Sequence, residues 1–232
     1  MAKAGGVVTG FGIAALAAWG LYNWLPDYYN PFAPLSPTDP PTMVTRYKLR
    51  QMANEPQACL AILKQASEEG MISYRTQNSV TGTCPLDSPV RVTRFGDVQL
   101  SSSFLASCPL ALSSAMFIHQ RARPLAASMM QSKLTRIDHL GSYACRNIYN
   151  RPGARLSEHA TADALDISGF RFANGQQITV LKGWKEKNAR GETLHALFRQ
   201  SCPFFGNSLG PDYNAAHANH FHLGMRGFGI CR

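Results

Sequence analysis

Two short segments of the chain hold a pattern of histidine and aspartate that is typical of metal sites. The first, RLSEHATADALDISGF, contains His159 and Asp166, and the second, GPDYNAAHANHFHLG, contains His217, His220 and His222. Residues two apart on a strand point the same way, so we expect His220 and His222 on one face of a strand. Two imidazoles on one face can serve a metal ion and its bound water. The spacing therefore predicts a metal-assisted reaction.

Asp166 is the residue that most favours a metal. It lies in the apolar run Leu-Asp-Ile, where a buried carboxylate must be paired or bound to a cation. Zinc would satisfy it, because His159, Asp166 and His222 supply two nitrogens and one oxygen and leave the fourth tetrahedral position for water. His220 then remains available to act on that water. Either motif alone is common by chance, but the two in this order favour zinc.

At these residues the chain resembles known families. The pattern H-x6-D followed by H-x-H resembles the zinc peptidases of the lysostaphin and D-Ala-D-Ala metallopeptidase superfamily. The two segments quoted above and the ending GFGICR are similar to the bacterial extensin-like C-terminal domain family, roughly from Cys59 to Arg232.

The resemblance implies roles for five residues. In the superfamily, the positions that match His159, Asp166 and His222 bind zinc, and the position that matches His220 is catalytic. The run H-x-x-H-x-H also resembles the penicillin-insensitive murein endopeptidases, which adds His217 to the candidate catalytic residues.

Three positions depart from these families. Ala162 stands where the superfamily commonly has Gly, and Gly224 stands where the extensin-like group often has Asp. Asn219 stands where the relatives have an acidic residue that is a natural general base. An amide cannot accept a proton at neutral pH, so either His220, assisted by His217, does the base work or this domain is catalytically impaired.

Arg146, in the segment SYACRN, is the candidate cation for a developing oxyanion. The alternative is a surface arginine held near a disulfide. Ser157 could hydrogen-bond the site or cap the local turn, and the cap is the simpler expectation. We expect the remaining histidines to be structural or exposed: His119, His139 and His195.

The chain of 232 residues is cationic, with 23 Lys and Arg against 14 Asp and Glu and a formal charge of +9. Its 45% hydrophobic content excludes a disordered chain. A cationic field would concentrate a polyanion such as anionic lipid or the carboxylate-bearing bacterial cell wall, although excess Lys and Arg also keep a protein soluble. No dense basic run is interleaved with aromatic residues, so we expect no nucleic acid partner.

The N-terminal segment predicts export. Residues Ala4–Pro26 are uncharged and follow Lys3. At about 1.5 Å rise per residue, a helix of this length can cross a hydrocarbon core about 30 Å thick, which predicts an anchor in the cytoplasmic membrane with the domain outside. The alternative is a cleaved signal peptide with Val7–Leu16 as its apolar region. Either interpretation places the domain in the bacterial periplasm, anchored to the inner membrane or released.

We expect three parts along the chain: residues 1–26 as membrane anchor or signal segment, 27–42 as a proline-rich linker, and 43–232 as one folded domain. Six prolines between Pro26 and Pro41 oppose both helix and sheet. The linker is therefore predicted to be a stiff, extended spacer.

Apolar spacing predicts a helix over Gln57–Ala66 and a longer one over Pro109–Ser132, bent near Pro124. β-branched and alternating residues predict short strands over Val90–Arg94, Thr135–Tyr143, Ala164–Phe172 and Gln177–Leu181. The expected fold class is α+β, a single domain with a small antiparallel sheet that bears the zinc site and is tied by disulfides.

The six cysteines are dispersed, with no CxxC pair, which excludes a zinc ribbon or a thioredoxin-like site. Downstream of an export segment they predict three disulfides formed in an oxidising compartment, and the alternative is free thiols in a cytosolic protein. The expected pairs are Cys59–Cys84, Cys108–Cys145 and Cys202–Cys231.

Compartment, charge and resemblance together predict a zinc metallopeptidase that hydrolyses stem-peptide or cross-link amide bonds of peptidoglycan, as an endopeptidase or a carboxypeptidase. A catalytically inactive wall-binding or scaffold domain is the alternative, motivated by Asn219 and Gly224. A third possibility is a structural protein of a membrane complex. The sequence names no protein partner.

Overall fold

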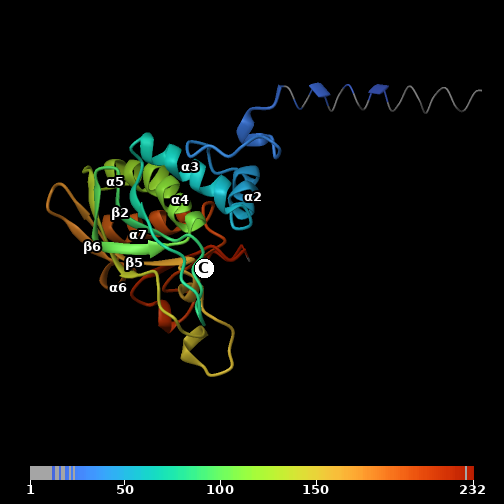
Figure 1. The fold of residues 1–232 in the computed structure, drawn as a ribbon. Coiled ribbons are helices and arrows are strands. Elements are labelled where there is room, and N and C mark those ends of the chain that lie inside the picture. The colour runs from blue at the N-terminus through green and yellow to red at the C-terminus, as the bar shows by residue number, and fades with distance from the viewer. Residues whose placement is uncertain (1–11, 14–15, 17–18, 21, 23, 228) are drawn as a thin grey trace, which may run out of the picture.

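The computed structural model describes residues 12–13, 16, 19–20, 22, 24–227 and 229–232. Within these residues an eight-stranded sheet has the order β1-β2-β3-β4-β5-β8-β7, and β6 pairs with β5 (Figure 1). The strands are β1 (Ser73–Thr76), β2 (Val90–Phe95), β3 (Val98–Ala106), β4 (Leu134–Gly141), β5 (Ala164–Phe172), β6 (Gln177–Thr179), β7 (Asn207–Leu209) and β8 (Phe221–Gly224).

The sheet is mixed. Its neighbouring strands are antiparallel except for β3 and β4, which run parallel. A parallel pair needs a long crossover, and here the helical segment between Ala106 and Leu134 supplies it. The expected small antiparallel sheet is therefore wrong in size and in direction, although a single mixed helix and strand domain with disulfides is confirmed.

Helices cover one side of the sheet. The helices are α2 (Met43–Gln51), α3 (Pro56–Glu68), α4 (Cys108–Phe117), α5 (Arg123–Met129), α6 (Val180–Gly183) and α7 (Ala189–Ser201). In Figure 1, α3, α4 and α5 lie above the sheet, while the segment between β4 and β5 extends from its other side. All ten residues of α4 are buried, so this helix lies at the centre of the hydrophobic core. Burial of apolar surface in this layer fixes the sheet that bears the site.

Most predicted elements are present. The helix expected at 57–66 and the strand expected at 164–172 are confirmed, the latter with the same bounds. The long helix is interrupted by a π-helical turn, Ile118–Ala122, and Pro124 lies just after it, at the start of α5. The strand expected over 177–181 ends at Thr179, because α6 begins at Val180.

Three disulfides use all six cysteines. The expected pair Cys202–Cys231 is confirmed. The other two expected pairs are wrong: the structure joins Cys59 to Cys108 and Cys84 to Cys145. Cys59 and Cys108 lie on the adjacent helices α3 and α4, so helix packing decides the pairing rather than order along the chain.

The proline-rich segment packs on the domain. The Lys48 ammonium donates to the carbonyl oxygen of Asp27 at 2.7 Å, and the Gln120 amide donates to that of Pro37 at 3.0 Å. Leu35 is buried in the core cluster. The expected extended spacer is therefore wrong for residues 27–42, because the carbonyl groups that proline keeps out of regular structure are bound by side chains of α2 and the π-helical turn.

The expected membrane segment, residues 1–26, falls largely outside the described residues. Among the residues that are described, no helix has the length and the apolar character needed to span a bilayer.

Candidate metal site and active site

Two neighbouring strands and one short helical turn bring the predicted metal ligands together. Asp166 on β5 and His222 on β8 are direct partners in the register of these strands. His159 lies on a 3-10 turn, Glu158–Thr161, just before β5. The Ser157 hydroxyl accepts from the backbone N–H of His159, so Ser157 caps this turn as expected.

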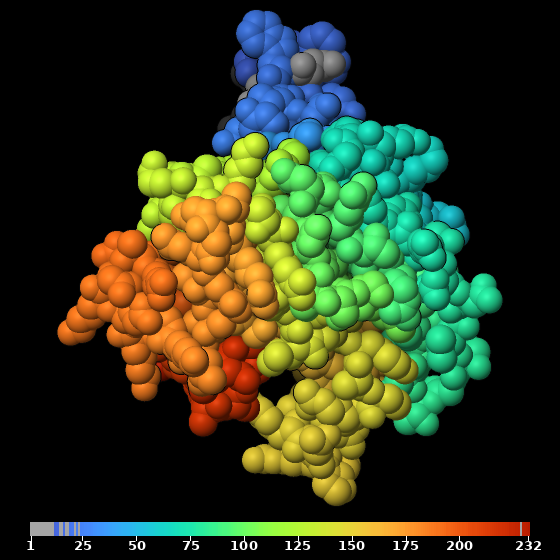
Figure 2. All heavy atoms as spheres, turned by 90° about the vertical axis from the view of Figure 1, so that its left-hand side faces the viewer, coloured from blue at the N-terminus to red at the C-terminus, as the bar shows by residue number. Residues whose placement is uncertain are grey.

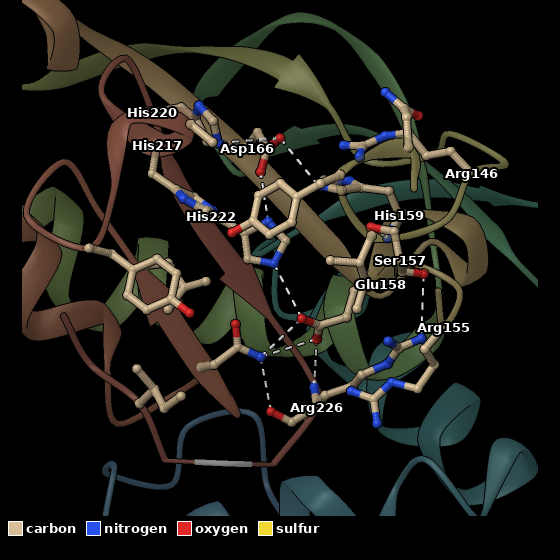
Figure 3. Close-up of a pocket in the computed structure, with 18 residues that line it drawn as sticks. Arg146, Arg155, Ser157, Glu158, His159, Asp166, His217, His220, His222 and Arg226 are labelled. Atoms are coloured by element: carbon tan, nitrogen blue, oxygen red, sulfur yellow. Dashed lines mark hydrogen bonds and ion pairs between the residues drawn. The ribbon is translucent and has the colours of Figure 1, made fainter. Parts of the chain in front are cut away.

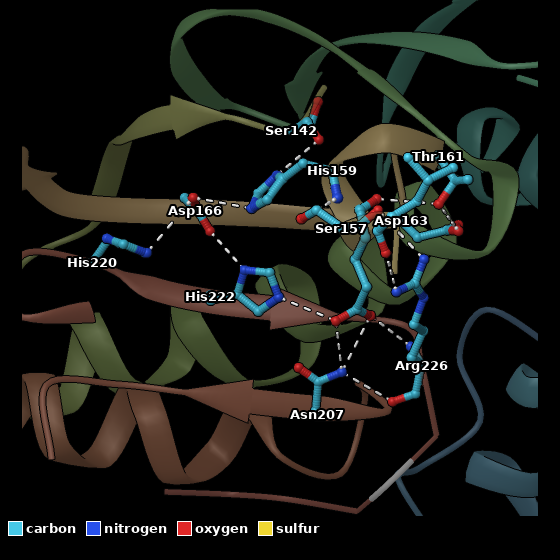
Figure 4. Close-up of polar contacts among 12 residues, drawn as sticks. Ser142, Ser157, His159, Thr161, Asp163, Asp166, Asn207, His220, His222 and Arg226 are labelled. Atoms are coloured by element: carbon cyan, nitrogen blue, oxygen red, sulfur yellow. Dashed lines mark hydrogen bonds and ion pairs between the residues drawn. The ribbon is translucent and has the colours of Figure 1, made fainter. Parts of the chain in front are cut away.

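The three side chains have the spacing of a metal site. His159 Nε2 lies 3.2 Å from Asp166 Oδ2, and His222 Nδ1 lies 3.0 Å from Asp166 Oδ1 (Figure 4). One ligand atom from each residue can be chosen so that all lie within 4.8 Å of one another. Ligand atoms about 2.0–2.2 Å from zinc at tetrahedral angles are separated by about 3.3 Å. The two histidine–aspartate separations, each to one oxygen of Asp166, are close to that value.

Each metal-site histidine has its other ring nitrogen on a protein acceptor. His159 Nδ1–H donates to the carbonyl oxygen of Ser142 at 3.0 Å, and His222 Nε2–H donates to Glu158 Oε2 at 3.3 Å. Histidines that ligate metals are usually held in this way, because the second bond fixes the tautomer and the ring orientation. The arrangement leaves His159 Nε2 and His222 Nδ1 on the side of Asp166.

Glu158 is a member of the cluster that the sequence reasoning missed. Its buried carboxylate accepts the backbone N–H of Arg226 at 2.7 Å and the side-chain amide of Asn207 at 3.1 Å, besides the His222 ring (Figure 4). A Cβ on Gly224 would lie only 2.5 Å from Glu158 Oε1. Gly224, which departs from the extensin-like group, thus leaves the room that the Glu158 carboxylate occupies.

The pKa values of the cluster reflect burial and these contacts. Burial alone would raise the pKa of Asp166, but its hydrogen bonds with His159 and His222 hold it well below the usual range. Burial alone would lower the pKa of His222, but its hydrogen bonds with Asp166 and Glu158 raise it to about 9. Burial would likewise raise the pKa of Glu158, but the His222 contact and the Arg226 N–H outweigh it and lower the pKa. The two carboxylates thus contact opposite nitrogens of the His222 ring: Asp166 lies on Nδ1 and Glu158 on Nε2.

His220 and His217 lie beside this cluster. His220 Nε2 is 3.6 Å from Asp166 Oδ2, and its Nδ1–H donates to Asn219 Oδ1 at 2.8 Å. His217 Nδ1–H donates to Asn214 Oδ1 at 2.8 Å, and its ring centroid is 5.2 Å from that of His220. β8 begins at Phe221, so His222 lies on the strand and His220 directly before it, not on the same strand as predicted.

Both of these histidines are neutral at pH 7. Burial, followed by the positive charge of His222, lowers the pKa of His217 to about 4. Burial also lowers the pKa of His220, and this effect outweighs the nearby Asp166 carboxylate, which opposes it. A neutral imidazole with one free ring nitrogen can accept a proton.

The cluster lies in a cavity of about 670 Å³. One wall comes from residues 146–159, including Arg146 and Tyr149, and the other from residues 207–222, including Tyr213 (Figure 3). Figure 2 shows the molecular surface hollowed between the gold segment around residue 150 and the red C-terminal segment. The two walls are joined by a hydrogen bond from the Asn214 amide to the Tyr149 hydroxyl at 2.9 Å.

The other candidate residues lie in different places. Arg146 lines the cavity and directly follows Cys145 of the Cys84–Cys145 disulfide. The remaining histidines lie outside this cavity and have partners elsewhere: His119 with Arg123, His139 with the Ser102 carbonyl, and His195 with the Trp184 carbonyl.

Ala162 ends the turn that bears His159 with φ 53° and ψ 33°, in the left-handed region. Glycine adopts this conformation without a Cβ penalty, so Ala162 holds a backbone position that favours glycine.

Comparison with known proteins gives a family. The family model described as "Extensin-like protein C-terminus" matches residues 57–232, which include every residue of the metal cluster and the cavity. Neither a curated protein nor a solved structure matches the chain.

Proposed function

This chain belongs to the extensin-like protein C-terminus family, and we propose that it is a zinc-dependent peptidase that hydrolyses stem-peptide or cross-link amide bonds of bacterial peptidoglycan. One observation supports this above all others. His159, Asp166 and His222 converge in a cavity beside two neutral histidines. A cluster that only stabilised the fold would not need a cavity large enough for a peptide.

The donor set fits zinc. Two imidazole nitrogens and one carboxylate oxygen form a set found in catalytic zinc sites, whereas Mg²⁺ and Ca²⁺ prefer oxygen ligands. The Ser142 carbonyl and the Glu158 carboxylate hold the rings in place. Bound there, zinc would polarise the scissile carbonyl group and make water more acidic.

His220 is the proposed general base. Its Nδ1–H is held by Asn219 Oδ1, so the free lone pair is on Nε2, the nitrogen nearer to Asp166. A neutral imidazole in that orientation accepts a proton from water and then donates it to the leaving amine. His217 lies next to His220 and supports the same chemistry.

Asn219 has a specific part in this proposal. The amide cannot itself be the base, but its oxygen selects the tautomer that His220 needs. The two departures that favoured an inactive domain, Asn219 and Gly224, thus each have a role compatible with activity. We expect Asn219→Ala to lower kcat more than it raises KM, and Asn219→Asp to retain activity, in an assay of muropeptide release.

Arg146 and the cavity walls would bind the substrate. The Arg146 guanidinium is the proposed partner of the oxyanion. It lines the same cavity as His220, and its positive charge contributes to the lowered pKa of His220. The cavity volume of about 670 Å³ is in the range of small-molecule and peptide sites. The disulfides favour an oxidising compartment, which supports a domain in the periplasm, anchored to the inner membrane or released from it.

Metal removal and restoration test the proposal. Full-length protein treated with a chelator should release no muropeptides from sacculi, and added zinc should restore release. The alternative, a wall-binding or scaffold domain without catalysis, predicts sacculus binding and no products even with zinc bound. Products that persist after complete metal removal would overturn the assignment of zinc.

A further inference from the structure

A straight row of long polar side chains crosses the side of the sheet that faces away from the helices. Register pairing connects one residue from each of five neighbouring strands, β2 to β6. These residues, which we name the polar row, are Arg94, Gln99, Arg136, Arg171 and Gln177. Neighbouring strands lie about 4.8 Å apart, so the row is about 19 Å long.

The polar row faces solvent. Its members are exposed, apart from the half-buried Arg136. Their neighbours along the chain are core residues: Phe95, Val98, Ile137, Phe170 and Ile178. Because side chains alternate along a strand, the row must lie on the face opposite the core.

The row has more positive than negative charge. Asp138 accepts from Arg136 Nε at 3.0 Å and from Arg171 Nε at 2.8 Å. These bonds fix the two guanidinium groups through Nε and leave their terminal nitrogens available in the described part of the chain. Arg94 donates through Nε to the Ser73 hydroxyl. The row thus carries three arginines, of which Arg136 and Arg171 pair with Asp138.

The same face leads to the metal site. Asp166 and Arg171 both lie on β5, five residues apart, which is about 17 Å along a strand. The register of β4 against β5 skips Ser168, and such a bulge lets two residues at an odd separation share a face. Between them, Ile167 and Phe170 belong to the core. A polymer that lies on the polar row is therefore within reach of the cavity.

We propose that the polar row binds an extended, carboxylate-bearing polymer, namely the peptidoglycan on which the proposed function acts, and the inference rests on that function. Arginine forks pair with carboxylates, and a linear row fits a strand better than a flat membrane. The aromatic rings of these strands, Phe95, Phe104, Phe170 and Phe172, are buried, so none can stack on nucleic acid bases. The row would hold the wall polymer while the cavity acts on a peptide branch.

Sedimentation with purified sacculi tests the proposal. The full chain is used without metal, so that binding is measured in the absence of digestion. The triple variant Arg94→Gln, Arg136→Gln, Arg171→Gln should bind about tenfold more weakly at low salt. The matched control removes three positive charges on and before α7: Lys187→Gln, Arg190→Gln and Arg199→Gln. It should bind as the unmodified protein does.

Two further measurements keep the result decisive. Asp138→Asn frees the guanidinium groups of Arg136 and Arg171 and should tighten binding, a gain that misfolding cannot produce. Sacculi whose carboxylates have been amidated should bind the triple variant and the unmodified protein equally.

The proposal is overturned if the triple variant binds sacculi like the control. It is also overturned if the triple variant loses binding to DNA or to phosphatidylglycerol vesicles but not to sacculi. Digestion of sacculi with binding that does not depend on the row would refute the row alone. Row-dependent binding without products, from zinc-loaded protein, would refute the peptidase alone.

Discussion

Replacing Glu158 by Gln should weaken zinc binding without unfolding the protein. The carboxylate lies 3.3 Å from His222 Nε2 and is buried, so its charge acts on the ring with little solvent screening. Glutamine keeps the shape but loses the charge. Its amide group would also face donors, the N–H of Arg226 and the amide of Asn207.

The expected loss follows from the general effect of such contacts. Removing an outer partner of a ligating histidine costs about 10- to 100-fold in metal affinity, or about 1.4–2.7 kcal/mol. Competition with a chromogenic chelator measures the zinc dissociation constant, and circular dichroism checks folding. Glu192→Gln, an exposed change on α7, is the matched control. Equal zinc affinities for the two folded variants would refute the reasoning about Glu158.

Three other predictions concern the same cluster and the disulfides around it. Gly224→Ala should lower zinc affinity in the same assay, because the new Cβ would lie 2.5 Å from Glu158 Oε1 and must displace it; unchanged affinity would mean that the carboxylate has another place to go. In metal-free protein, the contacts that raise the pKa of His222 to about 9 stabilise the fold fully below its ordinary pKa and are lost as pH rises. The melting temperature of the chelator-treated protein should therefore fall between pH 7 and pH 9.5, and a flat profile would contradict the ion-pair network. Removing the Cys84–Cys145 disulfide by double Ala substitution should cost about 4 kcal/mol of unfolding free energy for its separation of 61 residues, measured by denaturant titration; a loss below about 1 kcal/mol would show that this link does not constrain the unfolded chain.

Local pattern predicted the elements better than their arrangement. The apolar pattern predicted both ends of β5 correctly, because the apolar side chains Leu165, Ile167, Phe170 and Phe172 of this strand belong to the core. The parallel pairing of β3 with β4 depends on how the helical crossover packs, which no local period reveals. The proline-rich segment looked extended by composition, yet Lys48 and Gln120 bind its carbonyl groups.

The candidate site was predictable where residue type and spacing together indicate one kind of chemistry. His159, Asp166 and His222 come together as the spacing suggested. Glu158 was missed although it is next to His159 in the sequence, because its partner His222 is 64 residues away on another strand. Only the pairing of β5 with β8 brings the two together.

The central claim, that the cluster is a zinc peptidase site, is tested most directly by mass spectrometry of sacculi incubated with the full-length, zinc-loaded protein. His159→Ala removes one ligand, and His139→Ala is the matched control, since His139 lies outside the cavity. New muropeptides are expected from the unmodified protein and the control, and none from His159→Ala. Their mass and sequence would identify the bond. Absence of products from folded, zinc-loaded protein, or equal products from His159→Ala, would contradict the proposed function.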